Sequence, residues 1–200
     1  MVAVAVLRYR PLLSMPGGIT IVIEAVAALV AFGVLIVWIP RSATHAVISA
    51  GVSLGALAAV VQVMHLVVER FVHIAPSVEG FVSLAFMLAT FLLWGVAGFR
   101  AASESGAMKF GATAGLWSAI VTMTLVVAAG FLFEFFLASP NPAEVAQWAE
   151  YLRSGWNDPH AFALANTMES GVSHLMLGPV IGAVFGVAGG AVSRLRSWRF

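Results

Sequence analysis

The chain has 200 residues, of which 61% are hydrophobic and only 10% are charged. Soluble domains carry about 25% charged residues, so this composition excludes an ordinary soluble domain. The net charge of +1 gives no indication of nucleic-acid binding. The absence of cysteine excludes disulfides, iron–sulfur clusters and thiol catalysis.

Long runs of Ala, Val and Leu predict membrane-spanning helices. A bilayer core of ~30 Å takes roughly 20 helical residues to cross, and backbone groups inside it must bond to one another. Unbroken apolar runs also lack the alternation of a membrane barrel. We therefore expect an all-α, polytopic helical bundle that forms one domain over residues 1–200. Its five predicted spans are residues 18–39, 44–69, 80–99, 110–133 and 161–192.

The first three spans differ in their polar content. Span 1 contains Glu24 and is longer than the apolar part of a signal peptide, which favours a retained helix. Span 3 is nearly featureless, with Ser83 and Thr90 as its only polar side chains. Span 2 carries one face of small and polar residues, namely Gly51, Gly55, Ala58, Gln62, His65 and Glu69.

A polar segment separates the last two spans. Span 4 runs into an aromatic end around Glu134, and residues 139–160 follow it. Helix starts are indicated at Ser139, Asn141 and Asp158, each of which is followed by proline. The sequence between Asn141 and Asp158 predicts a short amphipathic helix at the membrane surface.

Span 5 carries a column in which every fourth residue is polar or glycine. Residues four apart on a helix lie nearly above one another, so we expect one narrow stripe and a buried polar centre at its first half. Glycines at this spacing let another helix approach closely. The column consists of Asn166, Ser170, His174, Gly178, Gly182, Gly186 and Gly190, and Glu169 and Ser173 flank its polar half.

Because successive spans alternate in direction, the ionisable residues of the spans fall in the same half of the membrane. No Lys or Arg lies inside a span, so His, water, a metal ion or protonation must balance the carboxylates. The set forms the ligand inventory of a divalent-metal site in a helical bundle. It comprises Glu24, His65, Glu69, Glu134, Glu169 and His174. The spacing argues against a two-metal motif, since Glu169 and His174 are five apart and point about 140° away from each other.

Three other hypotheses use the same residues. His65 and His174 could hold haem b as axial ligands on two helices. The carboxylates and histidines could relay a proton or a cation, and Pro179 breaks span 5 as helices are broken at transport sites. The polar network, which also includes Gln62, Asn166, Ser170 and Ser173, could be purely structural.

Taken together, the sequence favours a membrane protein that binds and translocates a cation or proton. A metal or haem redox subunit is the alternative, and a structural subunit of a membrane complex is the third. An enzymatic activity is not favoured. We expect the lipid bilayer and further copies or other subunits as partners, and a bacterial inner membrane as the location. Six basic residues against four in the loops place the C-terminus inside and the N-terminus outside.

Overall fold

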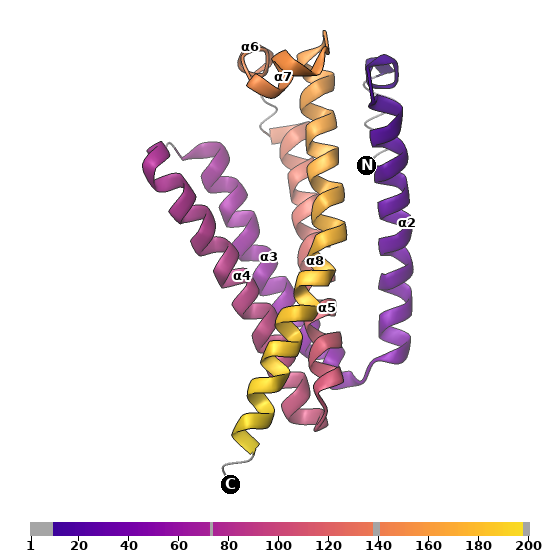
Figure 1. Ribbon diagram of the computed structural model, residues 1–200, viewed down its shortest axis with the longest axis vertical. Helices are drawn as coiled ribbons and strands as arrows, with labels where there is room; N and C mark the ends of the chain where they lie inside the picture. Colours follow the sequence, from indigo (N-terminus) through magenta and orange to yellow (C-terminus); the bar gives the residue numbers. More distant parts are fainter. Residues whose placement is uncertain (1–9, 73, 138–140, 198–200) are drawn as a thin grey trace. The chain divides into compact units, whose positions relative to one another are not determined.

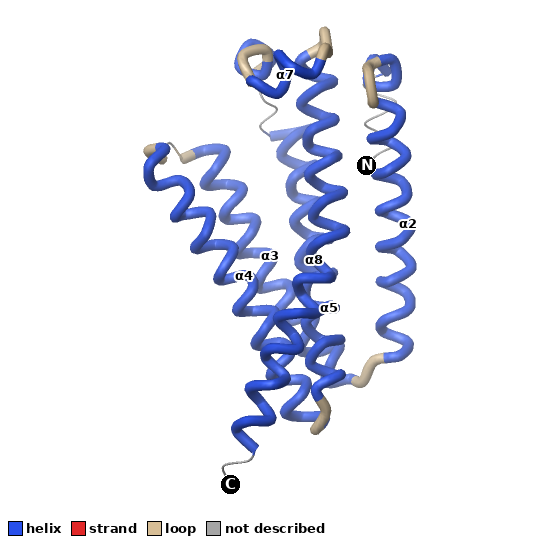
Figure 2. Tube along the Cα trace, viewed as in Figure 1, coloured by secondary structure: helices blue, strands red, loops and turns tan. Residues whose placement is uncertain are grey.

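The computed structural model describes residues 10–72, 74–137 and 141–197. These residues form helices and short loops, with no strand among them (Figures 1 and 2). In chain order the elements are η1 (Arg10–Ser14), α2 (Gly18–Ser42), α3 (His45–Phe71), α4 (Pro76–Ser105), α5 (Met108–Leu132), η2 (Phe133–Leu137, a π-helix), α6 (Pro142–Val145), α7 (Ala149–Ser154) and α8 (Pro159–Ser197).

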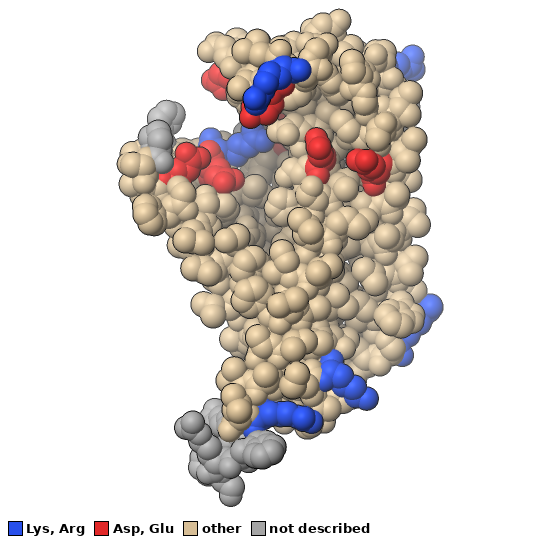
Figure 3. Space-filling view, in the orientation of Figure 1, with Lys and Arg blue, Asp and Glu red and all other residues tan. Residues whose placement is uncertain are grey.

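Five of these helices, α2, α3, α4, α5 and α8, are long and apolar enough to cross a bilayer. The predicted all-α, five-span bundle is thus confirmed, and the chain is an integral membrane protein. Figure 3 shows few Lys, Arg, Asp or Glu side chains on the visible face. Several helices are longer than their predicted spans. An apolar run marks only the part of a helix that lies within the lipid, and the helix can continue beyond that part. Helix α4, for example, begins at Pro76 and ends at Ser105 instead of covering 80–99.

Two local differences from the prediction have simple causes. Helix α2 continues through Pro40 to Ser42, and because the proline lies in the last turn, the bond and carbonyl contact that it disturbs are at the end of the helix. The polar segment forms two short helices, α6 and α7, instead of one amphipathic helix. Asn141 caps α6, as expected, by accepting a hydrogen bond from Ala143 N at 3.0 Å. Residues 138–140 lie outside the described part of the chain.

The described residues group into two compact units, and several long helices contribute to both. Unit 1 comprises Met1–Ala31 and Val127–His174, and unit 2 comprises Phe32–Val126 and Leu175–Phe200. The expectation of a single domain stays a prediction.

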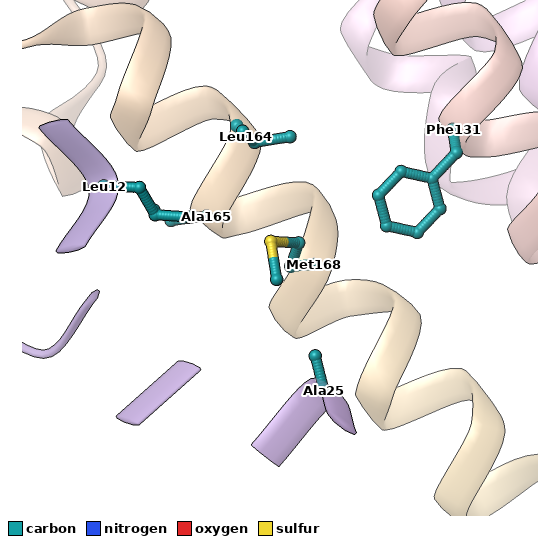
Figure 4. Packing of buried hydrophobic residues seen from close by; sticks show 6 residues of the cluster. All are labelled: Leu12, Ala25, Phe131, Leu164, Ala165 and Met168. Atoms are coloured by element: carbon teal, nitrogen blue, oxygen red, sulfur yellow. The ribbon is translucent and has the colours of Figure 1, made fainter. Parts of the chain in front are cut away.

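Unit 1 has a small hydrophobic core where η1, the first half of α2 and the end of α5 pack on the start of α8 (Figure 4). Asp158 begins α8, as expected, because its carboxylate accepts hydrogen bonds from His160 N and Ala161 N. The indole of Trp156 donates to the carbonyl of Pro16 at 3.1 Å, which ties the loop before α8 to the segment before α2. The buried residues of this core are Leu12, Ala25, Phe131, Leu164, Ala165 and Met168.

Unit 2 contains the neighbouring helices α3 and α4 (Figure 1), α5 up to Val126 and the second half of α8. Its buried centre consists mainly of alanine and glycine. A Cβ added at Gly55 would lie 2.6 Å from the carbonyl oxygen of Ser118, and one added at Gly186 would lie 2.9 Å from Gly115 Cα. Helix backbones are therefore in direct contact here, as small residues permit in membranes.

Candidate functional site

One face of α3 gathers polar side chains toward α4. Six residues of this face are separated alternately by four and three positions, namely Gly51, Gly55, Ala58, Gln62, His65 and Glu69. At 100° per residue this spacing keeps all six within about 40° of one line. The first half of the face meets α5 through glycine, and the second half meets α4 through Gln62 and His65.

His65 lies at the centre of the second half. Its Nε2 is 3.1 Å from Glu69 Oε1 and 3.1 Å from Ser83 Oγ. The ring of Phe86 stacks on the imidazole with a centroid distance of 5.0 Å. The His65 side chain is 15% exposed and that of Glu69 is 42% exposed. One face of the imidazole is thus covered while its partner carboxylate remains accessible.

These groups border a pocket where α3 ends and α4 begins. Its volume is ≈ 200 Å³. Glu79, in the first turn of α4, adds a second carboxylate to its wall. The lining residues are His65, Val68, Glu69, Val72, Ile74, Glu79, Val82 and Ser83.

Further hydrogen bonds continue along unit 2 from this pocket. Gln62 Nε2 donates to Thr90 Oγ1 at 2.9 Å. Beyond it, Trp94 Nε1 donates to Thr122 Oγ1 at 3.1 Å, and that hydroxyl lies 3.0 Å from the carbonyl oxygen of Gly55. Polar side chains thus join α3, α4 and α5 at two further levels.

The predicted site residues of unit 1 do not border the pocket of α3 and α4. Glu24 on α2 is exposed, and Glu134 is buried in the π-helix η2. His174 Nδ1 donates to the carbonyl oxygen of Ser170 at 2.7 Å. The residues Asn166, Glu169, Ser170, Ser173 and His174 are all exposed on α8.

The expected stripe along α8 is therefore wrong as a description of one buried face. Its glycines, Gly178, Gly182, Gly186 and Gly190, are buried, but its polar half is exposed. A step of four residues turns a helix by about 400°, so each step drifts by about 40° and six steps drift by roughly 240°. The two halves of the column thus point in different directions.

The structure gives the predicted metal and haem sites no support. Among the residues that it describes, no three His, Asp or Glu lie close enough to hold a metal ion. His65 and Glu69 belong to unit 2, whereas Glu24, Glu134, Glu169 and His174 belong to unit 1. The haem hypothesis on His65 and His174 stays a prediction.

The contribution of α4 to this pocket was not predicted from the sequence. Glu79, Ser83, Phe86 and Thr90 face α3 or its pocket. Their spacing could have predicted this shared face. The four residues are separated by four, three and four positions, the same alternation as on α3.

No protein-family model matches the chain, and no curated protein or solved structure matches it either. Any statement on function must therefore come from the geometry.

Proposed function

We propose that this membrane protein binds and passes a proton or another small cation, and that His65 and Glu69 form its binding group. The observation that carries the proposal is the position of His65 Nε2, 3.1 Å from both Glu69 Oε1 and Ser83 Oγ at the wall of a pocket. An imidazole nitrogen and a carboxylate oxygen at this distance are two adjacent groups that can each bind a proton.

The chemistry of the pair favours a proton. A lone charge deep in a bilayer costs at least ~2.5–3.5 kcal/mol. Glu69 and His65 together are neutral when they share one proton, and they reach a charge of one only when a proton is added or removed. Membrane-embedded carboxylates and histidines act as proton relays for this reason. Because Glu69 is partly exposed, protons can reach the pair from the pocket.

Two hydrogen bonds join the helices beyond the pocket. Gln62 donates to Thr90, and Trp94 donates to Thr122. The indole N–H of Trp94 can only donate, so these bonds hold α3, α4 and α5 together and are not a continuous proton path. The proposal therefore rests on the His65–Glu69 pair at the pocket.

Proton flux into vesicles tests the proposal. The purified chain is reconstituted in proteoliposomes that contain a pH-sensitive dye, and a pH gradient is imposed. We expect the wild type to dissipate the gradient and Glu69→Gln to fall to the rate of empty vesicles, because an amide cannot take up a proton. The matched control is Glu104→Gln, the same change at an exposed position near the end of α4, and it should retain the wild-type rate.

The other outcomes separate the remaining hypotheses. If Glu69→Gln folds and its proton flux is unchanged, the proposal is wrong. If wild-type vesicles move Na⁺ or K⁺ but not protons, and Glu69→Gln does not, the site binds a metal cation instead. A haem absorption band, or stoichiometric iron in the purified protein that is lost in His65→Ala, would assign the site to redox chemistry.

A further inference from the structure

The first half of α8 exposes a polar face of regular spacing. Asn166, Ser170, Ser173 and Leu177 are exposed and are separated by four, three and four residues. This is the alternation of the a and d positions in a heptad, which keeps a seam on one side of a helix. Val180 and Val184, also exposed, continue the same spacing along the sequence. The face therefore has the pattern of a helix that packs along a seam against another helix.

The two ionisable residues of this face flank the seam. In this register Glu169 occupies position g of one heptad and His174 occupies position e of the next. Five residues place them about 140° apart on one helix, too far round to contact each other. In a parallel pair of helices, however, position g of one helix meets position e of the next heptad on the other, and charged pairs there select the partner. The spacing that argued against an intrahelical site therefore suits a contact between two helices.

The seam is also complementary to itself. Asn and Ser side chains each donate and accept hydrogen bonds, so the same residue can bond to its own copy across a twofold axis. Serines let two backbones approach closely in a membrane. His174 uses Nδ1 to bond the carbonyl of Ser170, which leaves Nε2 to share a proton with a carboxylate.

From these observations we infer that the Asn166–Leu177 face of α8 binds the same face of a second copy of this chain. The two helices lie parallel, and Glu169 of each copy pairs with His174 of the other. Such pairing removes two carboxylates from contact with lipid. This inference does not depend on the proposed function, since it concerns residues of unit 1 and α8 only.

Disulfide cross-linking provides a direct test, because the chain has no cysteine of its own. Ser170→Cys and Ser173→Cys are made singly and oxidised in the native membrane. We expect most of each variant to run as a dimer of twice the 21.0 kDa chain mass. The control is Val30→Cys, which is 63% exposed and lies a similar number of residues into α2, and it should give only background dimer.

A charge exchange then tests the pairing itself. In the Ser173→Cys background, Glu169→His places two histidines together and His174→Glu places two carboxylates together, so each should reduce the dimer. Both changes in one chain restore the Glu–His pairs and should restore cross-linking. The inference is wrong if neither serine position forms dimer above the Val30→Cys background. It is also wrong if the cross-linked product contains a different protein, or if the exchanged pair fails to restore the dimer.

Discussion

One face of α3 and one column of α8 each combine small residues with polar ones, but the polar residues of α3 bond to a neighbouring helix whereas those of α8 are exposed. The glycines of α3 meet α5, and its Gln62 and His65 bond to α4. In α8 the glycine half packs on α4 and α5 within unit 2, whereas the polar half is exposed.

The difference comes from spacing. Alternating steps of four and three return α3 to the same angle after 18 residues, which is five turns. Steps of four alone place each successive residue of the α8 column about 40° further around the helix. Residues spaced by four along a long helix therefore come to lie on two different surfaces. In α8 the polar half is exposed and the glycine half is buried, so the two halves have to be interpreted separately.

The largest effect is expected where backbones touch. Gly186→Leu adds a side chain where a Cβ alone would lie 2.9 Å from Gly115 Cα. We expect the free energy of unfolding to fall by ~1–3 kcal/mol or more, the usual cost of overpacking. Thermal unfolding in detergent measures it. Gly33→Leu is the control, because nothing lies within 4 Å of a Cβ at Gly33; an equal loss there would contradict the argument.

A buried hydrogen bond should come next. Thr122→Val keeps the side-chain shape but leaves the indole N–H of Trp94, which is 1% exposed, without an acceptor. We expect a loss of ~1–3 kcal/mol in unfolding free energy. Thr113→Val is the matched change on the same helix, where the hydroxyl donates to Lys109 O within its own helix, and it should stay within about 0.5 kcal/mol of wild type. Combining Thr122→Val with Trp94→Phe should recover part of the loss.

The smallest expected effect is a coupling energy that differs between the polar residues of α3 and those of α8. A double-mutant cycle with Gln62→Leu and Thr90→Val should give a coupling of ~0.6 kcal/mol, the average for hydrogen bonds between membrane helices. The same cycle with Asn166→Leu and Ser170→Ala should give none in dilute detergent, because both residues are exposed in one chain. Coupling in the second cycle and none in the first would reverse the comparison.

The sequence was sufficient for the five spans, because hydropathy over about 20 residues depends on the lipid and hardly on neighbouring helices. It also identified the α3 face, since Gln62, His65 and Glu69 stand out on an apolar helix. It could not identify Ser83 or Thr90 as their partners, because the choice of neighbouring helix is made by packing between distant segments. The single stripe expected along α8 does not stay on one face, because a four-residue repeat drifts around a helix by about 40° at each step.

The core of unit 1 also determines when this part of the protein can fold during synthesis. Its contacts join the start of α2 to the start of α8, and the hydrogen bond between Trp156 and Pro16 spans 140 residues of sequence. At ~5–20 residues per second, a ribosome needs roughly 7–28 s to synthesise that interval. During those seconds α2 has no α8 surface to pack on, so the core of unit 1 can form only after the start of α8 has been made.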